Sequence, residues 1–129
     1  MILLDTHALV WSQSEPRKLS RLAEATIRRA WVSGSVAVSA ITLVELASLL
    51  NRGRIRTSDT VEVTVRRLIE EIEVIPLSLE IAIATSHFPV ESLPDPMDRI
   101  IAATARAEGI PLVTADERII SCNLIRTIW

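Results

Sequence analysis

The stretch Ile2-Leu3-Leu4-Asp5 is a short aliphatic run that ends on an acid, and Thr6 and His7 follow it directly. Further short runs of aliphatic or β-branched residues lie at 36–38, 74–77, 112–113 and 126–129. Runs of this length, separated by longer segments with helical periodicity, are typical of strands buried on both faces of a parallel sheet. The order of the elements therefore predicts an α/β fold with a central parallel β-sheet of four to five strands.

Longer apolar patterns with helical periodicity lie between these runs and predict helices. They cover residues 19–33, 41–51, 58–72, 79–87 and 97–108. In the first helix, the stripe expected to face the core contains Leu22, Ala23, Thr26, Ile27 and Ala30. Strands that alternate with helices in this way place helices on both faces of the sheet.

The ends of the predicted helices carry local signals. Ser58 is expected to cap the helix at 58–72, and Asp95-Pro96 to open the one at 97–108. Gly34, Gly53 and Gly109 each fall just past a helical pattern, where a left-handed residue is favoured. No cluster of glycines remains to bind phosphate, so the sequence disfavours a P-loop and a dinucleotide-binding fold.

The composition is that of a globular chain: 129 residues, 49% hydrophobic and 23% charged, with a formal net charge of -2. We interpret residues 1–129 as a single domain that buries about two-thirds of its unfolded surface. The single cysteine, Cys122, cannot form an internal disulfide, and no Cys/His pair has the spacing of a zinc site. Neither a signal peptide nor a membrane span is expected, which favours a cytoplasmic protein.

The sixteen acidic residues fall into two groups. The glutamates are mostly interleaved with arginines on helical patterns, as on a solvated helix face. Asp5 closes the first strand, Asp116 follows the strand at 112–113, and Asp98 lies in the first turn of the last long helix. Because a parallel sheet forms its ligand crevice outside the carboxyl ends of its strands, these three acids are expected at one edge. The structural alternative is that Asp5 and Asp116 cap helices and that Asp98 forms a capping box with Asp95.

Glu45 is the only charged residue between positions 40 and 51, in a segment predicted to be a buried helix. A carboxylate buried there is costly unless an arginine or a shared cation pairs with it. If Glu45 meets the three aspartates, carboxylates ~4 Å apart repel by roughly 1 to 4 kcal/mol. An all-carboxylate set selects Mg2+ or Mn2+ over zinc or copper. Charge balance therefore predicts a divalent-metal site.

Four segments carry a resemblance to a known family. They are Leu3 to His7, Ser39 to Glu45, Asp95 to Ala105 and Leu112 to Ile119. Together they resemble the PIN-domain ribonucleases, specifically the VapC-type toxins of bacterial type II toxin–antitoxin systems. The resemblance implies a PIN-like α/β/α sandwich and a metal-dependent endoribonuclease that uses one or two Mg2+ or Mn2+ ions. The implied metal ligands and catalytic acids are Asp5, Glu45, Asp98 and Asp116.

The resemblance also implies roles for neighbouring residues. Thr6 and Thr114 match hydroxyl positions of the family pattern and would hydrogen-bond to the metal-binding acids. Asp95 is a candidate fifth acid, and a helix cap is its alternative role. Arg99 is a candidate phosphate contact, and a surface ion pair is the alternative.

The expected partners of the chain also follow from the resemblance, which implies an RNA substrate, a homodimer and a cognate antitoxin. An isoelectric point near 5.7 argues against an open basic groove. Thirteen of the fourteen basic residues are arginine, however, and arginine binds phosphate with two donors. Arg52, Arg54 and Arg56, in a turn expected to be exposed, are the preferred RNA or partner contacts.

Other enzyme classes with an acid after the first strand fit poorly. A haloacid-dehalogenase-type phosphatase needs a second aspartate where this chain has His7, and a downstream lysine, whereas Lys18 is the only lysine. A receiver domain lacks the same lysine, and a serine hydrolase needs a glycine-flanked serine that is absent. The remaining alternative is a PIN-like module that binds RNA or protein without cutting.

Overall fold

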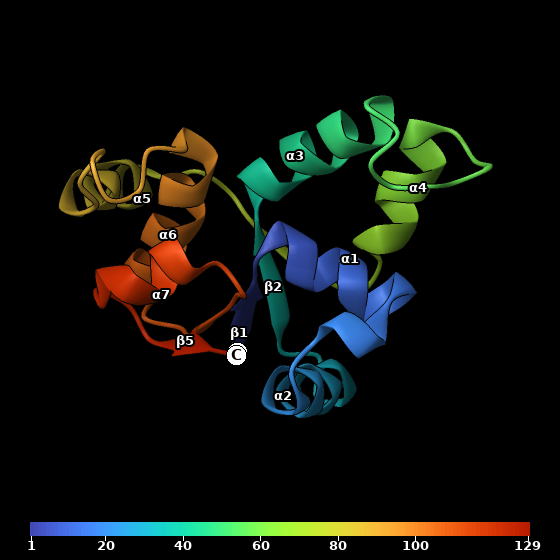
Figure 1. Cartoon of the computed structure of the whole chain (residues 1–129), viewed down its shortest axis with the longest axis horizontal. Coiled ribbons are helices and arrows are strands. Elements are labelled where there is room, and N and C mark those ends of the chain that lie inside the picture. The colour runs from blue at the N-terminus through green and yellow to red at the C-terminus, as the bar shows by residue number, and fades with distance from the viewer.

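The strands form one parallel sheet in the order β3-β2-β1-β4-β5, in a computed structural model that describes residues 1–129 (Figure 1). They are β1 (Ile2–Leu4), β2 (Val36–Ser39), β3 (Glu73–Ile75), β4 (Leu112–Val113) and β5 (Thr127–Ile128). β1 is central, because Leu3 pairs with Ala37 of β2 on one side and with Leu112 of β4 on the other. The five parallel strands confirm the predicted fold class.

Helices connect the strands. The α-helices are α1 (Thr6–Ser14), α2 (Arg21–Val32), α3 (Ala40–Asn51), α4 (Val61–Leu68), α5 (Leu79–Ala84), α6 (Pro96–Glu108) and α7 (Glu117–Cys122). Two short 3-10 helices, η1 (Pro16–Lys18) and η2 (Thr85–His87), follow α1 and α5. None of the helices combines the length and the apolar character needed to cross a membrane.

The hydrophobic core consists of two layers separated by the sheet. Successive side chains of a strand point to opposite faces. Ile2 and Leu4 of β1 therefore join a cluster with α1 and α2, whereas Leu3 between them joins one with α5, α6 and α7. Figure 1 shows these two groups of helices on opposite sides of the sheet. This arrangement confirms the predicted α/β/α sandwich.

The helix predicted at 58–72 is shorter than expected. α4 begins at Val61, and its cap is Thr60, not Ser58: the Thr60 hydroxyl accepts a hydrogen bond from the amide of Val63 at 3.2 Å. The helix ends at Leu68, and the turn that follows contains Glu71, whose left-handed φ of 62° prevents a helix from continuing to residue 72.

Two other elements differ from the sequence prediction. α1 and α7 were not among the helices predicted from apolar periodicity, because their nine and six residues contain too few turns to show one. Only the alternative in which Asp5 and Asp116 cap helices pointed to them, and both residues are indeed caps. β3 ends at Ile75 and not at Leu77, because Pro76 has no amide hydrogen with which to extend the ladder.

Three of the five residues predicted for the core stripe of α2 are buried. They are Ala23, Ile27 and Ala30, whereas Thr26 is half-buried and Leu22 is 55% exposed. One residue along a helix rotates the side chain by about 100°, which carries Leu22 away from the sheet. The helix begins at Arg21 because the Ser20 hydroxyl caps it, accepting from the amide of Ala23 at 3.0 Å.

Substitutions in α2 should affect stability differently at the buried Ile27 and at the exposed Leu22. We expect Ile27→Ala to lower the free energy of unfolding by about 3 kcal/mol, because it leaves a cavity under the sheet. Leu22→Ala should change it by less than about 0.5 kcal/mol. Urea unfolding followed by circular dichroism measures both, and equal losses for the two variants would contradict the assigned helix face.

Candidate active site

A cavity of about 420 Å3 lies at the carboxyl edge of the sheet. Its lining residues are Asp5, His7, Trp11, Glu45, Asp95, Asp98, Ala115 and Asp116. The four acids singled out in the sequence thus lie around one cavity, together with the candidate fifth acid. Asp5 and Asp116, which are 111 positions apart in the chain, meet there because the carboxyl ends of parallel strands lie at one edge of the sheet.

Each of the four acids comes from a different element. Asp5 follows the last residue of β1, and Asp116 follows β4, the neighbour of β1, by three residues. Glu45 lies in the second turn of α3, which continues directly from the end of β2 (Figure 1). Asp98 is the third residue of α6. Three adjacent strands and the first turn of one helix therefore position the acids.

Asp5 is 8% exposed and is held at both carboxylate oxygens. Oδ1 accepts from the amide of Thr6 at 2.7 Å, which makes Asp5 the cap of α1, and Oδ2 accepts from the hydroxyl of Thr114 at 2.7 Å. The same hydroxyl oxygen of Thr114 accepts from the amide of Asp116 at 3.0 Å. Thr114 therefore connects the segment after β1 to the segment after β4.

Glu45 is held by a second threonine. The hydroxyl of Thr6 donates to Oε1 of Glu45 at 2.9 Å and lies 3.2 Å from the hydroxyl oxygen of Thr42. The sequence indicated that α3 would be buried on nearly all sides, and this was wrong: Val44 is 52% exposed and Glu45 is only partly buried. The apolar character of α3 thus overstates its burial, and Glu45 lies on the side that faces the cavity.

Three aspartates complete the acidic lining. Asp116 caps α7 through the amide of Arg118 at 2.9 Å, and Asp95 caps α6 through the amide of Met97 at 2.8 Å. Asp98 takes part in none of the hydrogen bonds, so the capping box considered for Asp95 and Asp98 does not form. Capping and cavity lining are thus compatible roles, and Asp5, Asp95 and Asp116 combine them.

Burial and mutual repulsion act on the acids of this cavity. Burial raises the pKa of Asp5, although the bonds from Thr114 and Thr6 oppose it, and burial also raises the pKa of Glu45. The pKa of Asp98 rises from 3.8 to about 7, first through loss of solvent and then through the negative charges around it. Those charges belong to Asp95, Asp5, Asp116 and Glu45. The free protein therefore holds these carboxylates in an unfavourable electrostatic state.

No basic side chain neutralises the cavity through an ion pair. The four ion pairs of the structure lie elsewhere: Lys18–Glu15, Arg28–Glu24, Arg66–Glu62 and Arg67–Asp59. A set of carboxylate oxygens without a counter-charge fits a hard divalent cation. No three acidic, histidine or cysteine side chains are spaced to contact one ion together. Ligation would therefore require the carboxylates to turn toward a common point.

The arginines proposed from the sequence lie outside this cavity. Arg99 donates through Nη1 to the carbonyls of Leu93 and Pro94 at 2.7 and 2.8 Å, so it forms no ion pair and instead fixes the loop before α6. Arg52, Arg54 and Arg56 are exposed and line a neighbouring cavity.

Sequence reasoning missed two residues of the site, Trp11 and Thr42. Trp11 lines the cavity one helical turn from His7 on α1, and Thr42 lies three residues before Glu45 on the same face of α3. The spacing of Thr42 from Glu45 was visible in the sequence, whereas Trp11 could be placed only once a helix was recognised directly after Asp5. His7 stood out in the sequence as a possible base beside Asp5, with a solvent-facing or capping role favoured, and the structure places it in the cavity lining.

Comparison with known proteins places the chain in a family. A family model for the PIN domain matches residues 2–122. The chain belongs to the PIN-domain family. It is also 35% identical to Ribonuclease VapC22 of Mycobacterium tuberculosis, in an alignment of 130 residues that covers 99% of this chain and 98% of that protein.

Solved structures share the fold. A crystal structure of VapBC2 from Rickettsia felis, bound to a DNA fragment from their promoter, has a chain with a TM-score of 0.73 and 18% identity, covering 98% of this chain and 97% of its own. A toxin–antitoxin complex from Klebsiella pneumoniae contains a chain that matches with a TM-score of 0.64 and 25% identity. The match covers 90% of this chain and 87% of the Klebsiella chain.

Neutralising Asp98 should stabilise the metal-free protein near and above pH 7. The folded state holds the Asp98 proton up to a pH of about 7, and the unfolded chain only to about 3.8. Stability is therefore greatest below the unfolded pKa and falls as pH rises through the folded one. We expect Asp98→Asn to add about 1 kcal/mol at pH 8, a value reduced for partial exposure.

Thermal unfolding in EDTA across this pH range measures the effect. The matched control is Glu80→Gln, an exposed acid of α5 outside the cavity, which should leave the pH profile as it is in the unmodified protein. If the thermal stability of Asp98→Asn changed with pH in parallel with that of the unmodified protein, the charge on Asp98 would not destabilise the fold.

Proposed function

We propose that this protein is a divalent-metal-dependent endoribonuclease that hydrolyses phosphodiester bonds of RNA, and that it acts as the toxin of a toxin–antitoxin pair. The observation that carries the proposal is the convergence of four acids from four elements on one cavity with no arginine or lysine paired to them. The similarity to a named ribonuclease over nearly the whole chain supports it.

The residues that would hold the ion are Asp5, Glu45, Asp98 and Asp116. A bound Mg2+ or Mn2+ supplies a water of lowered pKa and offsets the charge that develops on the phosphoryl oxygens. Thr114 orients Asp5 and favours its ionised form by donating to Oδ2, and Thr6 does the same for Glu45 at Oε1. Asp98, which has no hydrogen bond, is the ligand able to turn toward the ion at least cost.

The proposed partners follow from the family and from the surface. A cognate antitoxin is supported by the likeness to a chain of a toxin–antitoxin complex. A homodimer is supported by apolar side chains around α5 that are each more than half exposed, namely Leu77, Leu79, Ile83 and Val90. An RNA substrate would place the activity in the cytoplasm.

Metal-dependent cleavage is the direct test of the proposed activity. Purified protein free of antitoxin is incubated with total bacterial RNA and Mg2+ or Mn2+, and new 5′ ends are mapped. We expect discrete cuts that EDTA abolishes and that Asp98→Asn reduces at least about 100-fold, since the variant loses one ligand of the ion.

Asp98→Asn is a cleaner variant than Asp5→Asn, because Asp5 also caps α1 and accepts from Thr114. Glu108→Gln, at an exposed acid near the far end of α6 that forms no ion pair, is the matched control and should leave cleavage intact. Cuts that persist in EDTA would overturn the metal mechanism. Folded protein that makes no cuts in any RNA would favour a PIN-like module that only binds.

Removal of the Thr114 hydroxyl should weaken metal binding while the four acids remain. Thr114→Val deletes the donor to Asp5, and we expect the affinity for Mn2+ to fall about 10- to 100-fold. Thr114→Ser retains the hydroxyl and should bind nearly as the unmodified protein does. Titration calorimetry measures both, and equal affinities for valine and serine would show that the hydroxyl does not orient the ligand.

A further inference from the structure

A second cavity adjoins the acidic one and has the opposite charge. Its volume is about 720 Å3. The lining includes Lys18, Arg52, Arg54 and Arg56, with Glu15 as the one acid. His7 and Trp11 line this basic cavity and the acidic cavity alike. A basic surface and the acidic centre are thus continuous across one histidine and one tryptophan.

The three arginines of the basic cavity have no partner within the chain, unlike several arginines elsewhere on the surface. Arg28, Arg66 and Arg67 form ion pairs with acids. Arg99 and Arg106 donate to backbone carbonyls. Arg52, Arg54 and Arg56 are exposed and make no side-chain hydrogen bond or ion pair, so their donors are free for an anion outside the chain.

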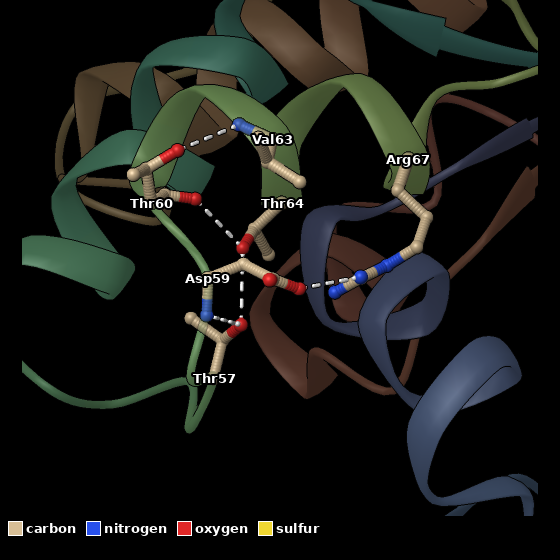
Figure 2. Close-up of polar contacts among 6 residues, drawn as sticks. All are labelled: Thr57, Asp59, Thr60, Val63, Thr64 and Arg67. Atoms are coloured by element: carbon tan, nitrogen blue, oxygen red, sulfur yellow. Dashed lines mark hydrogen bonds and ion pairs between the residues drawn. The ribbon is translucent and has the colours of Figure 1, made fainter.

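The turn that carries these arginines is tied down at its far end. Figure 2 shows the network that follows Arg56: the hydroxyl oxygens of Thr57 and Thr64 lie 3.1 Å apart, and the amide of Asp59 donates to Thr57 at 3.1 Å. Arg67 of α4 donates to Oδ2 of Asp59 at 2.7 Å. The turn is therefore anchored to α4, which limits the entropy lost when it binds a ligand.

Trp11 is held in place at the boundary between the two cavities. Its ring centroid is 5.6 Å from that of His7 and 6.0 Å from that of Trp129, with tilted planes. The ammonium of Lys18 lies 5.7 Å from the ring centroid. An indole fixed in this way, with part of its surface lining both cavities, offers a flat apolar platform beside cations.

An acidic centre that acts on a polyanion needs positive charge close by, because its own carboxylates repel phosphate. Phosphates bind arginines and bases stack on aromatic rings, so a basic cavity with an indole at its inner end has the chemistry of a single-stranded nucleic-acid site. A duplex hides its base faces and cannot use the indole. An acidic peptide could use the arginines but has no flat π-face for Trp11.

Resting on the nuclease function proposed above, we propose that the basic cavity is a single-stranded RNA subsite. An unpaired base next to the cut phosphodiester stacks on Trp11, and the phosphates beyond it lie on Arg52, Arg54 and Arg56. Trp11 is a positioning residue in this proposal, since it sets which phosphodiester reaches the acids.

The test measures RNA binding without cleavage. Variants are made in the Asp98→Asn background and titrated in EDTA against a fluorescently labelled, unstructured single-stranded RNA, with the duplex of the same sequence as a second probe. We expect Trp11→Leu to weaken single-strand binding about tenfold or more and Trp11→Phe to retain most of it. Trp31→Leu, at a tryptophan that lines a different cavity, should leave the affinity unchanged.

The arginines should act through charge and the tryptophan through stacking. The triple variant Arg52→Gln, Arg54→Gln, Arg56→Gln should lower the slope of log affinity against log salt by about 2, at roughly 0.7 per phosphate contact. Trp11→Leu should leave that slope unchanged. Thermal unfolding verifies that each variant is folded. If Trp11→Leu does not fold, Trp11→Phe keeps the test valid.

Three results would overturn the subsite: equal affinity for single strand and duplex, no loss of affinity in folded Trp11→Leu, or arginine-dependent binding of polyglutamate in place of RNA. These outcomes are separate from those of the cleavage test. Metal-dependent cutting together with unaltered binding by Trp11→Leu would remove the subsite and keep the nuclease. Trp11-dependent binding without any cutting would keep the subsite and remove the nuclease.

Discussion

Repulsion among carboxylates that share one cavity is the constraint on which the rest of this structure depends. The fold brings Asp5, Glu45, Asp98 and Asp116 together and supplies no arginine or lysine to pair with them. Two hydrophobic layers hold the sheet rigid beneath these acids, and that packing offsets the electrostatic cost. The raised pKa of Asp98 is the clearest sign of the strain. A cation is the simplest partner that relieves it.

Local hydrogen bonds decide which acids are fixed and which can move. Asp5 is bound at both oxygens, and Glu45 at one, through the hydroxyls of Thr114 and Thr6. Asp98 is bound at neither oxygen, so it can turn toward a cation without breaking a contact. The isoelectric point of the whole chain argued against binding of a polyanion. Beside the acidic centre, however, Trp11 and the exposed turn of arginines form a local basic surface that suits a polyanion.

The sequence predicted the sheet and the separations of the acids because both depend on short-range patterns. Ile2 to Leu4 reads as a strand from its own residues, and the carboxyl ends of parallel strands lead to one edge whatever the details of packing. The elements that were missed or misjudged depend on tertiary structure. α1 is too short to show a period, so Trp11 could not be placed beside Asp5. The apolar residues of α3 predicted burial, whereas Val44 is exposed. Similarly, Leu22 fits the α2 stripe by residue type but lies off the buried face.

The central claim, that the four acids form one cation site, is tested most directly by diffraction from crystals soaked in Mn2+. The account predicts one or two anomalous peaks inside the cavity, with oxygens of Asp5, Glu45, Asp98 and Asp116 turned inward to about 2.1–2.3 Å from the ion. Well-occupied Mn2+ sites found only elsewhere on the molecule, with these carboxylates still apart, would contradict it.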